Sequence, residues 1–228
     1  MPITTAVFDA YGTLFDVAAA ARALATEPGR GDLAAVWQKL AADWRAKQLQ
    51  YSWLRAVTGD YISFWQVTQD GLDWALEANG LNDLDLREHL LALYWELAAY
   101  PEVPAMLADL KSAGIATAIL SNGSKDMLDG AVSSANLGDL LDAVLSVEDV
   151  GQFKPDARVY DLVGSHFATT PDQVLFVSSN GWDAAAAAAY GFTTLWANRA
   201  GEPVDRLPGV PQHQANDLSG LAALATTL

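Results

Sequence analysis

The chain has 228 residues, of which 51% are hydrophobic and 18% charged, which is enough for one large domain or a domain with an insertion. Its 13 basic and 28 acidic residues give a net charge of -15, which disfavours nucleic acid and anionic membrane surfaces as partners. The absence of cysteine excludes disulfides, thiolate metal sites and cysteine nucleophiles. No stretch has the pattern of a signal peptide or of a membrane span, so we expect a soluble, cytoplasmic protein.

Short apolar runs recur along the chain and predict strands buried on both faces, as in a parallel sheet. The five runs are residues 4–8, 115–120, 143–146, 174–178 and 192–196. Helix-like segments lie between them, and residues 102–114 end at Gly114, which is typical of a helix C-terminus. This alternation predicts an α/β fold with a doubly wound, Rossmann-like parallel sheet. Near the C-terminus we expect a Pro-rich loop at 202–217 and a short helix from about Leu218.

Residues 17–98 interrupt this alternation, because they show helical periodicity and no convincing strand. We expect them to form an all-helical cap domain, inserted into a core made of residues 1–16 and 99–228. An insertion directly after the first strand would cover the C-terminal end of that strand as a lid. The run of alanines at 184–189 predicts a helix in a narrow space against the sheet.

Polar residues follow four of the predicted strands. In open α/β sheets, ligands bind outside the carboxyl ends of the strands, so we expect these residues to converge on one site. They are Asp9, Tyr11 and Thr13 after the first strand, residues 121–124 after the second, Lys154 and Tyr160 beyond the third, and residues 178–183 after the fourth.

The order of these motifs resembles the haloacid dehalogenase superfamily, whose members place an Asp nucleophile after the first strand and acidic groups after the fourth. Phosphatases of that superfamily carry a second Asp two residues after the nucleophile, and paired acids near the fourth strand that hold Mg²⁺. This chain has Tyr11 at the first of these places and only Asp183 at the second. A hard dication prefers several oxygen ligands, so we expect no metal and no other cofactor.

The pattern instead resembles the type II 2-haloacid dehalogenases, which need no metal. The stretches that carry this resemblance are FDAYGTLFDV, WRAKQLQYSWLR, AILSNGS, FKPDARVY and FVSSNGWDA, and the match covers nearly the whole chain. It implies hydrolysis of short L-2-haloalkanoic acids to D-2-hydroxy acids. In that reaction Asp9 would attack C2 with inversion and form an ester, which water then hydrolyses.

The resemblance also implies roles for the polar residues. Lys154 would keep Asp9 ionised, and together with Asp183 it would position or activate the water. The polar groups that orient these three residues and the water would be Thr13, Tyr160, Ser178 and Asn180.

On the substrate side, Arg45 would capture the departing halide, with Asn122 as its partner. Ser121 and backbone N–H groups at helix N-termini would bind the substrate carboxylate. The apolar pocket for the alkyl group would be formed by Tyr11, Leu49, Phe64 and Trp182. For Leu49 and Phe64, ordinary packing in the core or between domains is an equally good explanation of their apolar character.

Two alternative functions stay open. An Mg²⁺-dependent small-molecule phosphatase on the same fold is disfavoured by Tyr11 and by the missing acid pair. A catalytically idle binding protein is disfavoured because Asp9, Arg45, Lys154 and Asp183 occur together. The expected partners are a small anionic haloacid and a halide, with no nucleic acid and no membrane. Relatives commonly pair through their cap helices, so the resemblance also implies a homodimer.

Overall fold

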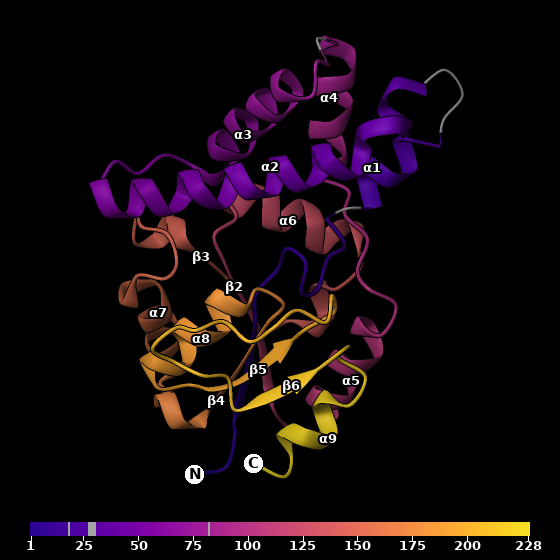
Figure 1. Ribbon diagram of the computed structural model, residues 1–228. Helices are drawn as coiled ribbons and strands as arrows, with labels where there is room; N and C mark the ends of the chain where they lie inside the picture. The colour runs from indigo at the N-terminus through magenta and orange to yellow at the C-terminus, as the bar shows by residue number, and fades with distance from the viewer. Residues whose placement is uncertain (18, 27–30, 82) are drawn as a thin grey trace.

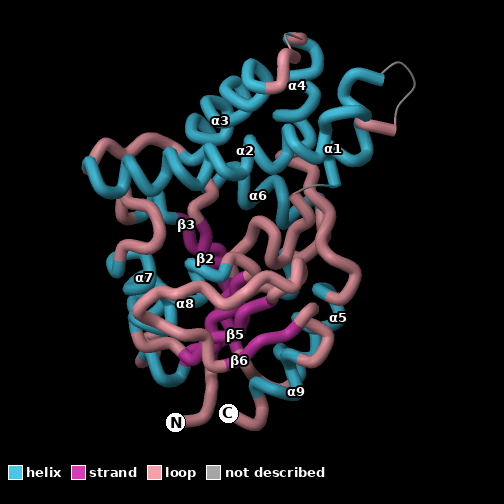
Figure 2. The backbone as a smooth tube through the Cα atoms, in the orientation of Figure 1, coloured by secondary structure: helices cyan, strands magenta, loops and turns pink. Residues whose placement is uncertain are grey.

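A six-stranded sheet forms the centre of the molecule in the computed structural model, which describes residues 1–17, 19–26, 31–81 and 83–228 (Figures 1 and 2). The strand order is β3-β2-β1-β4-β5-β6, and every neighbouring pair is parallel. This order confirms the predicted doubly wound sheet. The strands are β1 (Thr5–Phe8), β2 (Ala116–Ser121), β3 (Ala143–Ser146), β4 (Val174–Ser178), β5 (Thr193–Ala197) and β6 (His213–Ala215).

Helices cover both faces of the sheet, which explains why its central strands are apolar along their whole length. On one side α5 packs against α9 and β2, and on the other α7 and α8 pack against each other and against β2 and β4 (Figure 1). These core helices are α5 (Val103–Ser112), α6 (Lys125–Ser134), α7 (Ala157–Phe167), α8 (Gly181–Tyr190) and α9 (Leu221–Ala225). Short 3-10 turns lie at Gly138–Leu140, Val147–Asp149 and Pro171–Gln173.

The C-terminal region differs from the prediction. The expected loop at 202–217 contains β6, which pairs with β5 at the edge of the sheet, so the prediction of a loop throughout is wrong. A three-residue strand that follows Pro208 and Pro211 has no apolar run that would reveal it. The last helix begins at Leu221, after Gly220, rather than near Leu218.

A second group of helices, here called the cap, lies across the carboxyl ends of the strands (Figures 1 and 2). It comprises α1 (Ala19–Leu24), α2 (Gly31–Thr58), α3 (Phe64–Ala78) and α4 (Leu84–Leu93). The long helix α2 packs closely on α3 at Gly71, where an added Cβ would lie 3.3 Å from the backbone nitrogen of Gln48. No described residue within 17–98 belongs to a β-strand.

Two connections join the cap to the core, and they are hydrogen-bonded to each other. The Asp16 nitrogen donates to the Ala98 oxygen at 3.0 Å, and the Tyr100 nitrogen donates to the Leu14 oxygen at 2.9 Å. We therefore propose that the boundary between the core (1–16 and 99–228) and the cap (17–98) runs through this pair of connections.

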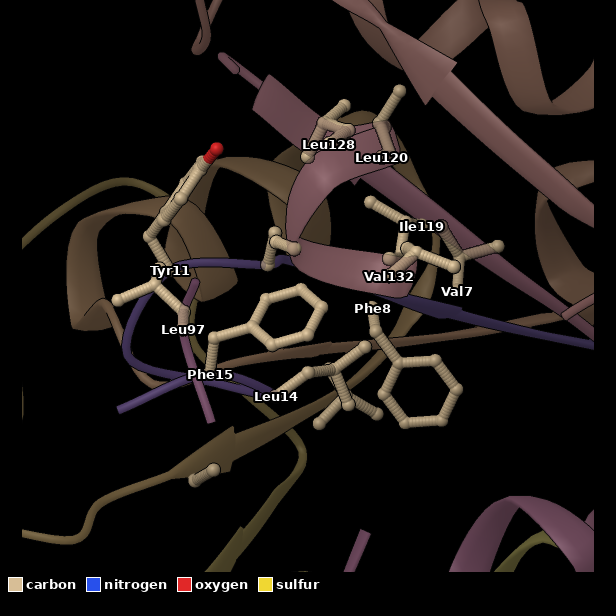
Figure 3. Close-up of a cluster of buried hydrophobic side chains, with 14 of the residues drawn as sticks. Val7, Phe8, Tyr11, Leu14, Phe15, Leu97, Ile119, Leu120, Leu128 and Val132 are labelled. Carbon is tan, nitrogen blue, oxygen red and sulfur yellow. The ribbon is translucent and has the colours of Figure 1, made fainter. Parts of the chain in front are cut away.

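Buried apolar side chains from β1, from the turn that follows it and from β2 pack into one cluster (Figure 3). Val7, Phe8, Leu14 and Ile119 are fully buried there. Burying each such side chain contributes roughly 1.5–3 kcal/mol to folding. The end of β1, which carries Asp9, therefore rests on a closely packed base.

Candidate active site

Asp9 stands at the end of β1 with 6% of its surface exposed. Its backbone nitrogen donates to the Val177 oxygen at 2.9 Å, which continues the pairing of β1 with β4. Its Oδ2 accepts hydrogen bonds from Thr13 Oγ1 and Asn180 Nδ2, each at 3.0 Å, and its Oδ1 accepts from Lys154 Nζ at 3.3 Å. The carboxylate of Asp9 thus accepts from three donors, one of which is a charged ammonium.

Lys154 reaches the site from the loop after β3 and is 1% exposed. Its Nζ lies 2.8 Å from Asp183 Oδ2, in addition to its contact with Asp9. One ammonium thus lies between two buried carboxylates. Its backbone nitrogen donates to Asn122 Oδ1 at 2.9 Å, so the turn after β2 fixes the course of this loop.

Asp183 lies in the first turn of α8 and is completely buried. Burial raises the pKa of its carboxyl group, and the charge of Lys154 opposes that rise. Tyr160 on α7 donates its hydroxyl to Asp183 Oδ1 at 2.8 Å. Burial and the charge of Asp183 raise the pKa of Tyr160 well above 10.0, so its hydroxyl remains a donor.

The turns after β1 and β4 hold each other in place. Thr13 Oγ1 accepts from the Ser179 nitrogen at 2.8 Å, and Ser178 Oγ accepts from the Asn180 nitrogen at 3.2 Å. Gly12 has φ +87°, and an added Cβ there would lie 3.0 Å from Ser179 Oγ. Ser179 lies within the range 178–183 that was expected at the site, but sequence reasoning assigned no role to this residue.

The turn after β2 is closed by two serines. Ser121 Oγ accepts from the Gly123 nitrogen at 3.0 Å, and Ser146 Oγ donates to the Gly123 oxygen at 2.7 Å. Both hydroxyls are buried beside the N-terminus of α6. An anion placed against this turn would meet the N–H groups at the start of that helix.

Arg45 lies on α2, and its side chain connects the cap to the core. Its Nη2 donates to Asn180 Oδ1 at 3.1 Å, and its Nη1 donates to Gln48 Oε1 at 2.7 Å. The structure therefore pairs Arg45 with Asn180 and Gln48, whereas Asn122 accepts from Lys154. Joint contact of Arg45 and Asn122 with a halide stays a prediction.

Gln48 is the main residue that sequence reasoning missed. It is fully buried in the cap, and its Nε2 donates to Thr68 Oγ1 at 2.8 Å and to Tyr94 Oη at 3.3 Å. Thr68 in turn donates to the Phe64 oxygen at 2.7 Å. Gln48 follows Arg45 by three residues, so both lie on one face of the helix, and this spacing could have indicated their contact from the sequence.

The apolar residues of the predicted pocket are only partly brought together. The rings of Tyr11 and Phe64 lie 6.1 Å apart, and Tyr11 is directed away from Phe15 (Figure 3). Leu49 is half-buried on α2, one turn after Arg45. Trp182 meets the ring of Trp53 edge to face at 5.3 Å.

The hydroxyl of Tyr11 is buried and has no hydrogen-bond partner among the described residues. Burial raises its pKa well above 10.0, the neighbouring Tyr94 and Asp9 add to this rise, and the charge of Arg45 opposes it. The ring lies over Gly123, where an added Cβ would fall 2.8 Å from Tyr11 Cε2. Tyr11 therefore faces the cap with an uncharged group.

The donor set does not suit a divalent cation. Within the described ranges, no three His, Asp or Glu side chains are grouped to hold a metal ion. The ammonium of Lys154 lies between the carboxylates of Asp9 and Asp183, where a dication would need them as ligands.

None of the helices in the described ranges has the length and apolar character needed to cross a membrane.

Comparison with known proteins agrees with this geometry. The model of the haloacid dehalogenase-like hydrolase family matches residues 3–191. (S)-2-haloacid dehalogenase 1 from Pseudomonas sp. (strain CBS-3) is 43% identical over 100% of this chain and 98% of its own length. A crystal structure of a dehalogenase superposes with a TM-score of 0.93 at 41% identity, covering 98% of this chain and 97% of the other.

A further solved structure is that of L-2-haloacid dehalogenase from Xanthobacter autotrophicus with chloropropionic acid covalently bound. It matches with a TM-score of 0.84 and 36% identity, over 97% of this chain and 98% of the other. The similarity to such proteins extends through both the cap and the core. The chain therefore belongs to the haloacid dehalogenase-like hydrolases, within the family of (S)-2-haloacid dehalogenases.

Proposed function

We propose that the protein hydrolyses short L-2-haloalkanoic acids to D-2-hydroxy acids and releases the halide. One observation carries this proposal. The buried carboxylate of Asp9 is held by Thr13, Lys154 and Asn180, and the same Asn180 accepts from Arg45 of the cap. A nucleophile and a cation that can receive an anion thus face one another across the boundary between core and cap.

In the first step an Asp9 oxygen donates a lone pair to C2, and the bond from C2 to the halogen breaks with its electron pair on the halide. Attack opposite the leaving group inverts C2. The guanidinium of Arg45 stabilises the negative charge that develops on the halide, with Asn122 as a second donor. Ser121 and the start of α6 receive the substrate carboxylate.

In the second step water attacks the acyl carbon of the Asp9 ester. Asp183 accepts the proton of this water, the bond between the acyl carbon and the ester oxygen breaks with its electron pair on that oxygen, and the proton passes to it to complete the hydroxyl of the product. Lys154 and Tyr160 hold Asp183 in place, while Thr13, Ser178 and Asn180 hold the loop around the ester. The products are the D-2-hydroxy acid and the regenerated Asp9 carboxylate, and one proton is released.

No step needs a metal ion, because Lys154 supplies the positive charge beside Asp9. The two alternatives fit less well. An Mg²⁺-dependent phosphatase would need a second acid in place of Tyr11 and a further carboxylate beside Asp183. An idle binding protein would not need a buried carboxylate with three donors.

The proposal also includes a substrate class and a setting. The substrate is a small anionic haloacid, and Tyr11, Leu49, Phe64 and Trp182 would surround its alkyl group. A homodimer and a cytoplasmic location are further parts of the proposal, and they rest on the resemblance and on the composition of the sequence.

The test is chloride release from L- and D-2-chloropropionate with EDTA, beside a phosphatase assay with Mg²⁺. We expect release from the L form alone, unchanged by EDTA and absent in Asp9→Asn. In single-turnover reactions in ¹⁸O water, the label should enter Asp9 and not the product. Phosphate release that depends on Mg²⁺, without any halide, would replace this proposal with the phosphatase. Equal 2-chloropropionate binding by wild type and Asp9→Asn without turnover would support the idle protein.

A further inference from the structure

A groove of about 710 Å³ lies beside the candidate active site, between the C-terminal half of α2 and helices α7 and α8. We call it the side groove. In Figure 1, this half of α2 lies above α7 and α8. The residues that line it include Trp53, Val57, Tyr160, Trp182, Ala186 and Leu207. None of the described residues that line the groove carries a charge. Its volume is in the range of pockets that hold small organic ligands.

Two rows of side chains lead from the active site into the side groove. On α2, Arg45, Leu49 and Trp53 follow one another at intervals of four residues and so share one face of the helix. At a rise of 1.5 Å per residue, Trp53 lies about 12 Å along the axis from Arg45. On α8, Trp182 and Ala186 are spaced in the same way, and Trp182 is two residues after Asn180.

The alanine run gives the side groove its depth. Ala184 and Ala187 are buried against the core, as expected for a helix in a narrow space. Ala186 and Ala189 line the groove instead, and their small side chains leave room that longer ones would fill. Tyr160 is a lining residue of the groove, and its hydroxyl donates to Asp183, so the groove and the catalytic groups share this residue.

The geometry of the proposed reaction points an alkyl chain in this direction. In-line attack places the halogen opposite Asp9, toward the cap, and the carboxylate lies on the β2 side at Ser121. Strands β2 and β4 flank β1 on opposite sides. The remaining substituents of C2 therefore face β4 and the start of α8, where Trp182 lines the side groove.

We propose that the side groove binds the alkyl chain of medium-chain L-2-haloalkanoic acids, so that the substrate class extends beyond 2-halopropionate to chains such as 2-bromooctanoate. This inference rests on the proposed function for its chemistry. An uncharged, aromatic-lined groove favours a hydrocarbon chain, and each methylene buried there tightens binding by about fourfold.

Two variants test the inference. Val57→Glu places a charge at the groove, and Ala186→Phe fills it. Val57 is 87% exposed, so its replacement leaves the core of the cap intact. The matched control is Leu54→Glu on the same helix, since Leu54 is 55% exposed and lies outside the lining of the groove.

The measurements are kcat/KM for L-2-bromopropionate and L-2-bromooctanoate, and the Kd of octanoate and propionate from tryptophan fluorescence. We expect wild type to bind octanoate at least tenfold more tightly than propionate and to turn over both bromoacids. Val57→Glu and Ala186→Phe should lose at least tenfold on the eight-carbon compounds and less than twofold on the short ones. Leu54→Glu should change neither.

Equal binding of octanoate and propionate by wild type would overturn the inference, as would equal effects of Val57→Glu and Leu54→Glu. The proposed function fails by a different result, namely no bromide from either bromoacid. Octanoate binding that depends on Val57 and Ala186 would still support the groove as the site for the chain in that case.

Discussion

The carboxylates of Asp9 and Asp183 share one cation: Lys154 Nζ lies 3.3 Å from Asp9 Oδ1 and 2.8 Å from Asp183 Oδ2. All three groups are buried, and they come from the end of β1, from the first turn of α8 and from the loop after β3. Two like charges of this kind need a cation between them to remain ionised together. The relationship therefore links the stability of the core to the chemistry proposed for it.

Lys154→Met should remove this cation and leave two carboxylates facing each other. Breaking a buried ion pair by removing one partner costs about 3–5 kcal/mol. We expect a loss of this size in the free energy of unfolding at pH 7, measured by urea denaturation, and a fall in kcat of at least a thousandfold. Lys125→Met removes the exposed partner of Asp149 and serves as control. An equal effect of the two variants on the urea midpoint would contradict the role given to Lys154.

Asp183 should set an acidic limit to activity. Its pKa is raised from 3.8, chiefly by burial, and its ionised form is the one that accepts the proton of the water. Activity should therefore be present above this raised pKa and decline as the pH falls through it, at a pH above 3.8. Asp183→Asn should lose turnover at every pH while still forming the Asp9 ester. Rapid quench and mass measurement of the intact protein would detect the trapped ester; free enzyme alone would exclude Asp183 from the second step.

The same raised pKa affects stability. A carboxyl group whose pKa is higher in the folded than in the unfolded chain favours folding at low pH, and this contribution is lost as the pH rises through the folded pKa.

Asp142 is the opposite case, because the Thr117 backbone N–H lowers its pKa from 3.8. Asp142→Asn should destabilise the protein at pH 7, and the difference should vanish at a pH below 3.8. Urea midpoints at the two pH values test this, and a difference that persists in acid would contradict it.

Gln48 should act as a positioning residue for Arg45. Gln48→Met keeps the length of the side chain but removes its bonds to Arg45, Thr68 and Tyr94. Leaving such buried partners unsatisfied costs roughly 1–3 kcal/mol of stability. We expect kcat to fall about 10–100-fold and inhibition by bromide to weaken, because the guanidinium loses its fixed direction.

Inhibition by bromide separates this role from a purely structural one. Gln50 is exposed on the same helix and pairs with Lys47, so Gln50→Met is the matched control. If Gln48→Met lowers stability but leaves kcat and bromide inhibition unchanged, Gln48 only holds α2 against α3.

Most strands and the catalytic groups of the core could be predicted from the sequence, for reasons that differ between elements. The central strands are continuous apolar runs because helices cover both faces, so five of the six strands could be predicted within a residue or so. The strand at His213–Ala215 could not, since a short edge strand is defined by its pairing with β5 rather than by its composition. The convergence of Asp9, Lys154 and Asp183 follows from strand order, which alternation and handedness restrict.

The contacts of the cap residues could not be predicted from the sequence in the same way. The partner of Arg45 depends on how α2 lies over the turn after β4, and no sequence pattern specifies that crossing. Gln48 looks like an ordinary helix residue until Thr68 and Tyr94 are brought around it by α3 and α4. Trp182 was expected at the alkyl pocket, and its contact with Trp53 is visible only once the cap and core are placed together.

Gly123 should be needed for the position of Tyr11. A Cβ on Gly123 would lie 2.8 Å from Tyr11 Cε2 and 3.1 Å from Leu128 Cδ2, so Gly123→Ala forces the ring to move in a packed environment. Such overpacking costs typically 1–3 kcal/mol, and we expect a stability loss in that range. The shifted ring should also raise KM for 2-chloropropionate. Gly138→Ala has no atom within 4 Å of the added Cβ and should leave the urea midpoint and KM nearly unchanged. Wild-type KM in Gly123→Ala would show that the site tolerates a displaced Tyr11.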